Sequence, residues 1–229
     1  MFDKTISSEY DAFKKEIYET CQYVHKSIIP GTREWDLYKG TFVLYSGLIY
    51  NPDFMFIGIN PGDGYCSGNN NKRSLDIEPG DGFEYINAYE EDYDYTLAKQ
   101  TREVFAKTKY MDRLPNSVKT NMFYVSTASQ KDLTQLVNIL RAKHSVDLFK
   151  ESSLWTKRLI GLFNPKIIIC EGKLVADLLS IYFNIEPEWI SGITSFQIEN
   201  RIQVLGYKRN RSIILNKAHL INSLNMLEI

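Results

Sequence analysis

The sequence lacks the features that mark several protein classes. Its three cysteines, Cys21, Cys66 and Cys170, are scattered and odd in number, so they give neither a disulfide framework nor zinc or iron–sulfur spacing. We expect buried free thiols at Cys21 and Cys170. No apolar run approaches the roughly 20 residues that cross a bilayer. The N-terminus is polar and mixed in charge, unlike a signal peptide. These absences predict a cytoplasmic protein without membrane contact.

An excess of charge of either sign is also missing. Lys and Arg number 27 and Asp and Glu number 28, which gives a net charge of −1. A dedicated non-specific DNA-binding protein is usually basic, because neutralisation of phosphates supplies most of its affinity. The balance favours a small ligand or a weakly held nucleic acid, for which a local basic patch suffices. The sequence contains no GxxxxGK[ST] loop, GxSxG elbow or metal-ligand cluster, so we expect no metal and no cofactor.

What is present is a chain of ordinary globular composition. Its 229 residues are 44% apolar, enough for one sizeable core. No repeat, low-complexity segment or linker-like change of composition divides it. We therefore predict a single domain over residues 1–229, with an irregular acidic insertion at about residues 65–95.

Short apolar runs followed by turn residues predict buried strands at residues 53–59, 119–126 and 167–170. The last run, with Gly172 and the helix-like residues behind it, forms a strand–turn–helix unit typical of parallel sheets. Further strands are predicted at 194–198, 202–207 and 212–215, with extended pieces at 41–50. Helices are predicted from a cap at Ser7 or Ser8 to about residue 28, and at 97–107, 132–143, 146–163 and 173–183. The predicted fold class is α/β, a three-layer α/β/α sandwich around a mainly parallel four-stranded sheet.

The stretch Asn60-Pro61-Gly62-Asp63-Gly64 directly follows the first predicted strand. Pro61 donates no backbone hydrogen bond, so the strand stops there. Gly62 and Gly64 permit unusual backbone angles and a close approach of a ligand to the main chain. Asn60 therefore stands at the carboxyl end of a buried strand, the edge of open α/β sheets where ligands bind. An ordinary strand-ending turn is the alternative.

Other polar residues have two readings each. Asn121 lies inside a predicted strand, where its amide either satisfies backbone groups or faces a pocket. The densest basic run, residues 208–211, is either a solvated turn or a phosphate contact. His219 follows a predicted strand end and is otherwise a capping or surface histidine. His25 lies off the apolar stripe of its helix, and we expect it and His144 to be exposed.

Four features follow one another in a fixed order: FIGINPG after a strand, TN in the second strand, NPKIIICEGKLVADLL, and a histidine after the last strand. This order resembles the uracil-DNA glycosylase superfamily over about residues 48–224, and GINPG resembles the first motif of its mismatch-specific thymine/uracil branch. The resemblance implies a monofunctional DNA glycosylase. Such an enzyme hydrolyses the N-glycosidic bond of uracil, or of another damaged or mismatched base, flipped out of DNA. It also implies a monomer whose partner is damaged or single-stranded DNA.

The resemblance assigns roles to individual residues. Asn60 would position the attacking water, and His219 would stabilise negative charge on the leaving base. Asn121 would hydrogen-bond the polar edge of the pyrimidine. The other implied contacts are base contacts at Gly58, Ile59, Pro61, Gly62 and Asp63, base stacking by Tyr65 or Phe83, and nucleic-acid contacts at Lys217, Leu220, Arg209 and Arg211.

The sequence also departs from the family. The last motif usually reads His-Pro-Ser or similar, whereas this chain has Ala218-His219-Leu220. Leu220 either enters DNA as a wedge or the chain lacks one, and Asp63 either supplies a carboxylate or caps a turn. The acidic loop after GINPG should repel phosphate. These departures keep open a second hypothesis, a module on the same fold that binds a nucleobase, nucleic acid or protein without cleavage. A different α/β hydrolase is disfavoured by the missing motifs.

Overall fold

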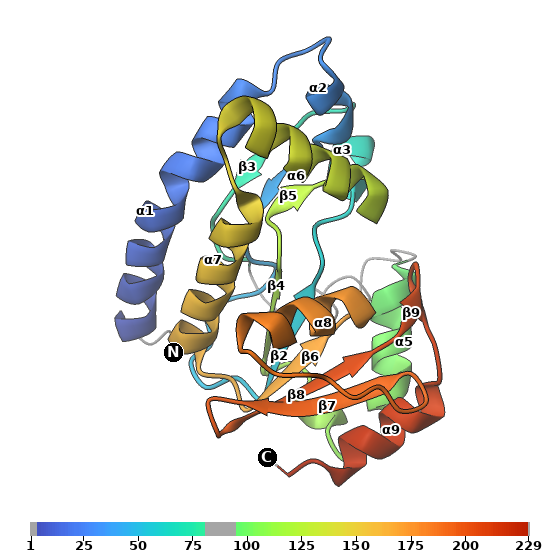
Figure 1. Cartoon of the computed structure of the whole chain (residues 1–229). Coiled ribbons are helices and arrows are strands. Elements are labelled where there is room, and N and C mark those ends of the chain that lie inside the picture. Colours follow the sequence, from blue (N-terminus) through green and yellow to red (C-terminus); the bar gives the residue numbers. More distant parts are fainter. Residues whose placement is uncertain (1–3, 81–94, 229) are drawn as a thin grey trace. The chain divides into compact units, whose positions relative to one another are not determined.

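The computed structural model describes residues 4–80 and 95–228, and its contacts divide the chain into two compact units (Figure 1). Unit 1 comprises Met1–Leu44, Ile59–Pro79 and Asn121–Leu162, and unit 2 comprises Tyr45–Gly58, Gly80–Thr120 and Phe163–Ile229. Each unit is thus assembled from three separate segments. The single domain predicted from the sequence stays a prediction.

Unit 2 contains a five-stranded, mostly parallel sheet in the order β4-β2-β6-β8-β7. Strand β6 pairs in parallel with β2 on one side, from Phe54 opposite Ile167 onward, and with β8 on the other. Strand β7 pairs antiparallel with β8 through a turn in which Glu199 and Asn200 both have positive φ. The elements of unit 2 are β2 (Phe54–Gly58), α5 (Thr96–Phe105), the 3-10 turn η1 (Met111–Arg113), β4 (Ser117–Asn121, whose last residue is assigned to unit 1), β6 (Ile167–Cys170), α8 (Lys173–Tyr182), β7 (Ile193–Ile198), β8 (Ile202–Tyr207), β9 (Arg209–Asn210), β10 (Ile213–Ile214) and α9 (Lys217–Met226).

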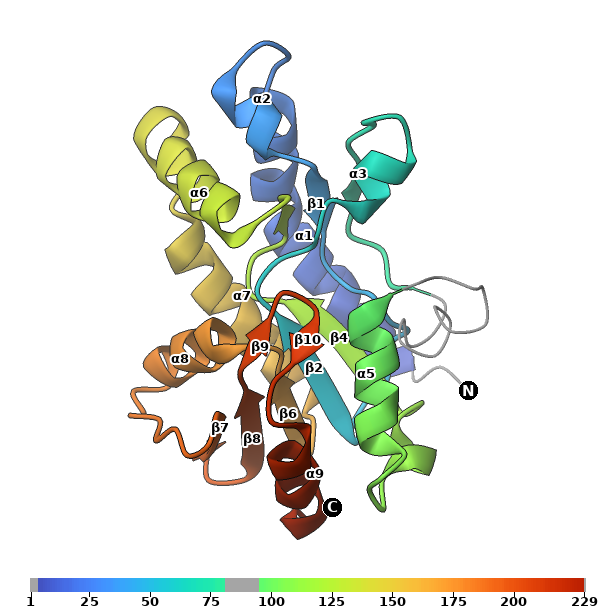
Figure 2. The same cartoon turned by 90° about the vertical axis from the view of Figure 1, so that its right-hand side faces the viewer.

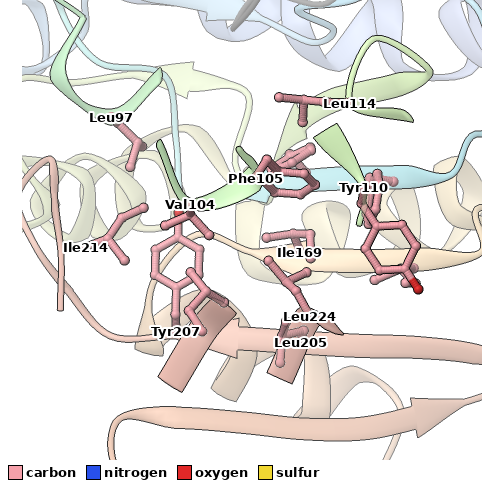
Figure 3. Close-up of a cluster of buried hydrophobic side chains, with 14 of the residues drawn as sticks. Leu97, Val104, Phe105, Tyr110, Leu114, Ile169, Leu205, Tyr207, Ile214 and Leu224 are labelled. Atoms are coloured by element: carbon pink, nitrogen blue, oxygen red, sulfur yellow. The ribbon is translucent and has the colours of Figure 1, made fainter. Parts of the chain in front are cut away.

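Alternate residues of the central strands point to one face of this sheet, where α5 and α9 pack. Figure 3 shows Ile169, Leu205 and Tyr207 of the strands meeting residues of α5 and α9. The rings of Phe54 and Phe105 pack edge to face, with centroids 5.0 Å apart. The residues of the main sheet in this cluster are Phe54, Phe56, Ile167, Ile169, Ile193, Leu205 and Tyr207.

Helix α8 lies on the other side of the sheet from α5 and contacts β8 and β6 (Figure 2). Helix α8 approaches β8 so closely that a Cβ on Gly206 would lie 2.6 Å from the Cβ of Ala176. The absence of a side chain at Gly206 is what permits this contact. Helices therefore flank both faces of the sheet, which explains why its central strands are apolar throughout.

Unit 1 is built around α1, whose predicted apolar stripe is confirmed. Tyr10, Phe13, Ile17, Cys21, Val24 and Ile28 are all buried. A small sheet in the order β3-β1-β5 completes the unit, with β1 parallel to β3 and antiparallel to β5. The elements of unit 1 are α1 (Lys4–Ser27), α2 (Arg33–Leu37), β1 (Gly40–Phe42), α3 (Gly64–Gly68), β3 (Leu75–Asp76), β5 (Val125–Ser126), α6 (Gln130–His144) and α7 (Leu148–Phe163).

Helices α6 and α7 confirm the predicted spans with small shifts at their ends. Ser129 begins α6, where its hydroxyl accepts a hydrogen bond from the backbone N–H of Asp132. In α7, Trp155 is buried and stacks on Tyr124 with ring centroids 5.2 Å apart. Phe149 and Leu154 of the same helix are 43% and 51% exposed.

Several strand predictions were wrong in detail. The main sheet has five strands, because the predicted strand at 194–198 joins it as the antiparallel edge strand β7. The predicted strand 119–126 is two strands, β4 and β5, which belong to different sheets. The region expected to be irregular from residue 65 contains α3, which begins at Gly64, and β3 within its described part.

Two predictions about single residues also need correction. His25 was expected to be exposed, but it is half-buried and its Nδ1 lies 2.8 Å from the hydroxyl of Tyr38. His144 is largely covered, and its Nε2 lies 3.7 Å from a carboxylate oxygen of the buried Glu34.

All three cysteines are buried free thiols, as predicted for Cys21 and Cys170. Among the helices of residues 4–80 and 95–228, none combines the length and the apolar character that a membrane span requires.

Candidate functional site

The order of the strands defines where a ligand would bind. Strand β2 lies between β4 and β6, and the chain leaves β2 towards β4 on one side but leaves β6 towards β8 and β7 on the other. In open α/β sheets, ligands bind beyond the carboxyl ends of the strands at such a switch point. We call the ends of β2, β4, β6 and β8, from Gly58, Asn121, Cys170 and Tyr207 onward, the carboxyl edge.

Asn60 comes two residues after β2, and its side-chain amide is held by a set of acceptors in unit 1. Its Nδ2 lies 2.8 Å from the carbonyl oxygen of Pro61, 3.0 Å from Oγ1 of Thr127 and 3.4 Å from the carbonyl oxygen of Val125. Because backbone carbonyls only accept hydrogen bonds, these contacts fix which end of the amide is the NH₂ group. Among the described residues, none donates a hydrogen bond to its Oδ1. This oxygen can accept one from a water or a ligand.

The segment that follows β4 runs beside Asn60 and holds the GINPG turn in place. The N–H of Phe123 donates to the carbonyl of Ile59 at 3.0 Å, and the N–H of Thr127 donates to that of Pro61 at 3.2 Å. The hydroxyl of Ser126 donates to the carbonyl of Gly62. These bonds extend the pairing of neighbouring strands past the sheet. They hold the turn against residues 123–127.

Open space lies beside the two glycines of this turn. A Cβ added at Gly62 or Gly64 would meet no atom within 4 Å, and neither residue has a positive φ. The backbone angles of Gly62 and Gly64 therefore do not require glycine, although the sequence suggested that they would. Pro61 is buried and Ile59 is half-buried, so only part of this main chain is open to a ligand.

Asn121 is the last residue of β4 and is 5% exposed. Within the described residues, its side chain makes no hydrogen bond. A buried amide without partners is costly, so such a group usually meets a water or a ligand. The side chain of Asn121 is thus suited to hydrogen-bond the polar edge of a pyrimidine, as the resemblance implies.

A buried ion pair at the carboxyl edge of unit 2 was missed by the sequence analysis. The Nζ of Lys119 in β4 lies 2.5 Å from Oε2 of Glu171, the first residue after β6, and their side chains are 6% and 1% exposed. The Nε of Arg209, just beyond β8, donates to the carbonyl oxygen of Glu171 at 2.7 Å. One signal was present in the sequence: an acidic residue directly after the apolar run IIIC.

His219 does not stand at the end of a strand of the main sheet. It lies in the first turn of α9, exposed, and α9 follows the two-stranded hairpin β9–β10. The residues that follow β8 at the carboxyl edge are instead Lys208 and Arg209. His219 belongs to unit 2, whereas Asn60 and Asn121 belong to unit 1. The predicted convergence of these three side chains therefore stays a prediction.

The predicted nucleic-acid contacts differ in accessibility. Leu220 is 3% exposed and belongs to the buried cluster of the main sheet, α5 and α9, so in this structure it is not available as a wedge. Lys217 pairs with Glu103 at 2.9 Å. The guanidinium of Arg209 is committed to the carbonyls of Glu171 and Arg211, whereas the side chain of Arg211 is exposed at the tip of the β9–β10 hairpin.

Tyr65 remains a candidate for stacking on a base. It is 46% exposed, and its ring packs edge-on against Phe42 with centroids 5.4 Å apart. Phe83, the other candidate, lies outside the described residues. Asp63 precedes α3, but its carboxylate makes no capping hydrogen bond there. Its capping role is therefore not supported.

The thiol beneath the carboxyl edge is unsuited to nucleophilic chemistry. Burial, together with the nearby charge of Glu171, raises the pKa of Cys170 far above its ordinary value, so the thiol stays protonated. Burial and the same carboxylate also raise the pKa of Tyr207. In the part of the chain that the structure describes, no group of three His, Cys, Asp or Glu residues is arranged to hold a metal ion.

No protein-family model matches this chain, and no curated protein matches it.

Proposed function

We propose that this protein is a uracil-DNA glycosylase-like enzyme that releases uracil, or another damaged or mismatched base, flipped out of DNA. The observation that carries the proposal is Asn60, whose NH₂ group is fixed by three acceptors while its Oδ1 is left to accept a further hydrogen bond. Such an oxygen can orient a water for attack on the sugar. The strand order and the helices that flank the sheet also support the proposal, and we propose with it that the fold is a three-layer α/β/α sandwich.

The chemistry suits a monofunctional hydrolase. Extrusion of the base from DNA costs a few kcal/mol, least for a mismatched, damaged or single-stranded base. Cleavage then builds negative charge on the leaving base, and a hydrogen-bond donor aimed at it is worth about 3 kcal/mol. The Nδ2 of Asn121 is such a donor. An amide at position 60 orients water but is a poor base, so we expect a slow enzyme.

The test is release of uracil from single- and double-stranded oligonucleotides, measured as cleavable abasic sites. Asn121→Ala should lower the rate about 100-fold at an unchanged melting temperature, because its side chain makes no hydrogen bond to the described residues. Asn60→Ala should also abolish release, and some loss of stability is expected from its three lost bonds. The exposed Asn222→Ala in α9 is the matched control. If no deaminated or mismatched base yields an abasic product, the proposal is refuted.

A binding module on the same fold is the second candidate, and the position of His219 favours it. No histidine follows β8, where the family places the group that stabilises the leaving base. Free bases and single-stranded DNA titrated into the protein would separate the two candidates. Binding without base release would favour the module.

A further inference from the structure

The Lys119–Glu171 ion pair is unusual because both charges are almost fully buried. Their atoms are 2.5 Å apart, and the two side chains are 6% and 1% exposed. Removal of two charges from water costs several kcal/mol per ion, and apolar pairs of similar volume are often as stable or more stable. Stability alone therefore does not account for this pair.

A second ion pair lies at the opposite, amino ends of strands β2, β4 and β6, and it offers a comparison. Asp53, just before β2, accepts hydrogen bonds from Lys166 at 2.6 Å and from Asn116 at 3.0 Å. The Lys166 side chain is 47% exposed, so this pair at the amino edge is partly solvated. The buried pair lies instead at the carboxyl edge, where ligands of such sheets bind.

The contacts of the buried pair tie together every parallel strand end on this edge. Glu171 donates its N–H to the carbonyl of Ile57 in β2 at 2.9 Å, and its own carbonyl accepts from Arg209 beyond β8. Lys119 receives a further restraint, because its N–H donates to the hydroxyl of Ser46 at 3.0 Å. The pair thus joins β4 to β6 across the end of β2.

We propose that Lys119 and Glu171 are a positioning pair for the base: they hold the ends of β4 and β6 at a fixed separation around Gly58. Because Asn121 follows Lys119 by two residues, both side chains lie on the same face of β4. The pair therefore fixes where Asn121 presents its amide. This inference rests on the proposed function, since it concerns the group that would read the base.

The test compares four proteins. Lys119→Met/Glu171→Leu replaces the pair by apolar side chains, Lys119→Arg keeps the charge, and Asp53→Asn breaks the amino-edge pair as the matched control. KM and kcat for uracil release from a single-stranded oligonucleotide are measured at 10 °C, and melting temperatures are measured in parallel. The low temperature prevents partial unfolding from mimicking a loss of affinity.

The apolar double variant should keep its melting temperature or raise it, while KM rises on the order of tenfold or more, because a small misplacement of a binding group is costly. Lys119→Arg should keep a KM close to that of the original protein, because it keeps the charge. Asp53→Asn should lower the melting temperature and leave KM unchanged. A double variant with the KM of the original protein would overturn the inference. If that variant does not fold, Glu171→Gln takes its place with the same expected rise in KM.

Failure of the proposed function has a different signature. If the original protein releases no base, the dissociation constants of free uracil, thymine and cytosine, measured by NMR titration, replace KM. Weaker binding by the double variant then supports the positioning role without catalysis, and equal binding overturns it. If the original protein binds none of the three bases, both the function and the inference are refuted.

Discussion

At the scale of single residues, Gly206 shows how one missing side chain shapes the sheet. A Cβ there would lie 2.6 Å from Ala176 Cβ and 2.9 Å from Thr194 Cγ2, and the Cβ of Ala176 is fixed to a helix backbone. We predict that Gly206→Ala lowers the free energy of unfolding by about 1 to 3 kcal/mol, because an overpacked core must shift. Urea unfolding measures this change.

Two further variants check the cause. Ala176→Gly in the Gly206→Ala background removes the clashing atom and should recover part of the loss. Gly161→Ala in α7 is the control, because its Cβ would meet no atom within 4 Å, and alanine favours a helix. It should leave stability unchanged or raise it. A Gly206→Ala protein as stable as the original would show that α8 moves away at no cost.

Single residues also show what the sequence could and could not predict. The buried stripe of α1 was predictable because its spacing follows the helical period. The Lys119–Glu171 pair was not, because its partners are 52 residues apart and only the fold brings them together. The sequence predicted that His219 follows a strand end, and β10 does precede it, but no local pattern distinguishes the separate hairpin of β10 from the main sheet.

At the scale of elements, Asp53 joins the amino ends of β2, β4 and β6. Burial alone would raise the pKa of Asp53, but hydrogen bonds from Asn116 and Lys166 and the charge of Arg113 hold that pKa below its ordinary value. A depressed folded-state pKa means that the ionised form stabilises the fold. The stabilisation is complete above the unfolded-state pKa of about 3.9 and is lost as pH falls through the folded-state value.

We therefore predict that Asp53→Asn lowers the free energy of unfolding by about 1 to 3 kcal/mol at pH 7. The difference from the original protein should begin to shrink below about pH 4, where Asp53 becomes protonated in the unfolded chain, and should be lost as pH falls through the depressed folded-state pKa. Urea unfolding at pH 7, 5 and 3 tests both statements. A difference that stays constant down to pH 3 would mean that the charge of Asp53 does not stabilise the fold.

The boundary between β4 and β5 shows why apolar runs alone do not predict where a strand ends. Residues 122–125 are all buried, so the sequence continues the pattern of β4 without a break. Yet β4 ends at Asn121, and Val125 begins β5 in another sheet. Burial alone produces such a run, and it does not indicate which strand each residue pairs with. The helices were predicted more accurately, because their period is visible in the sequence itself.

At the scale of the whole molecule, the even charge balance conceals an uneven distribution. Residues 200–227 contain five of the 27 Lys and Arg residues and no Asp or Glu, which leaves 22 basic and 28 acidic residues in the rest of the chain. This segment includes β8, the β9–β10 hairpin and α9. A near-neutral protein thus carries a basic segment that leads from the carboxyl edge of its sheet.

If this segment contacts the phosphates of DNA, as the resemblance implies for Arg209, Arg211 and Lys217, the contribution of each cation appears in the salt dependence of binding. Arg211→Gln should weaken binding to a single-stranded oligonucleotide and reduce the slope of log K against log salt by about 1. Arg201→Gln is the matched control, because it removes the same charge at the β7–β8 turn, where Arg201 pairs with Glu199 at 3.2 Å. Fluorescence anisotropy at several salt concentrations measures both slopes. Equal slopes for the two variants would show that net charge, rather than the hairpin, governs binding.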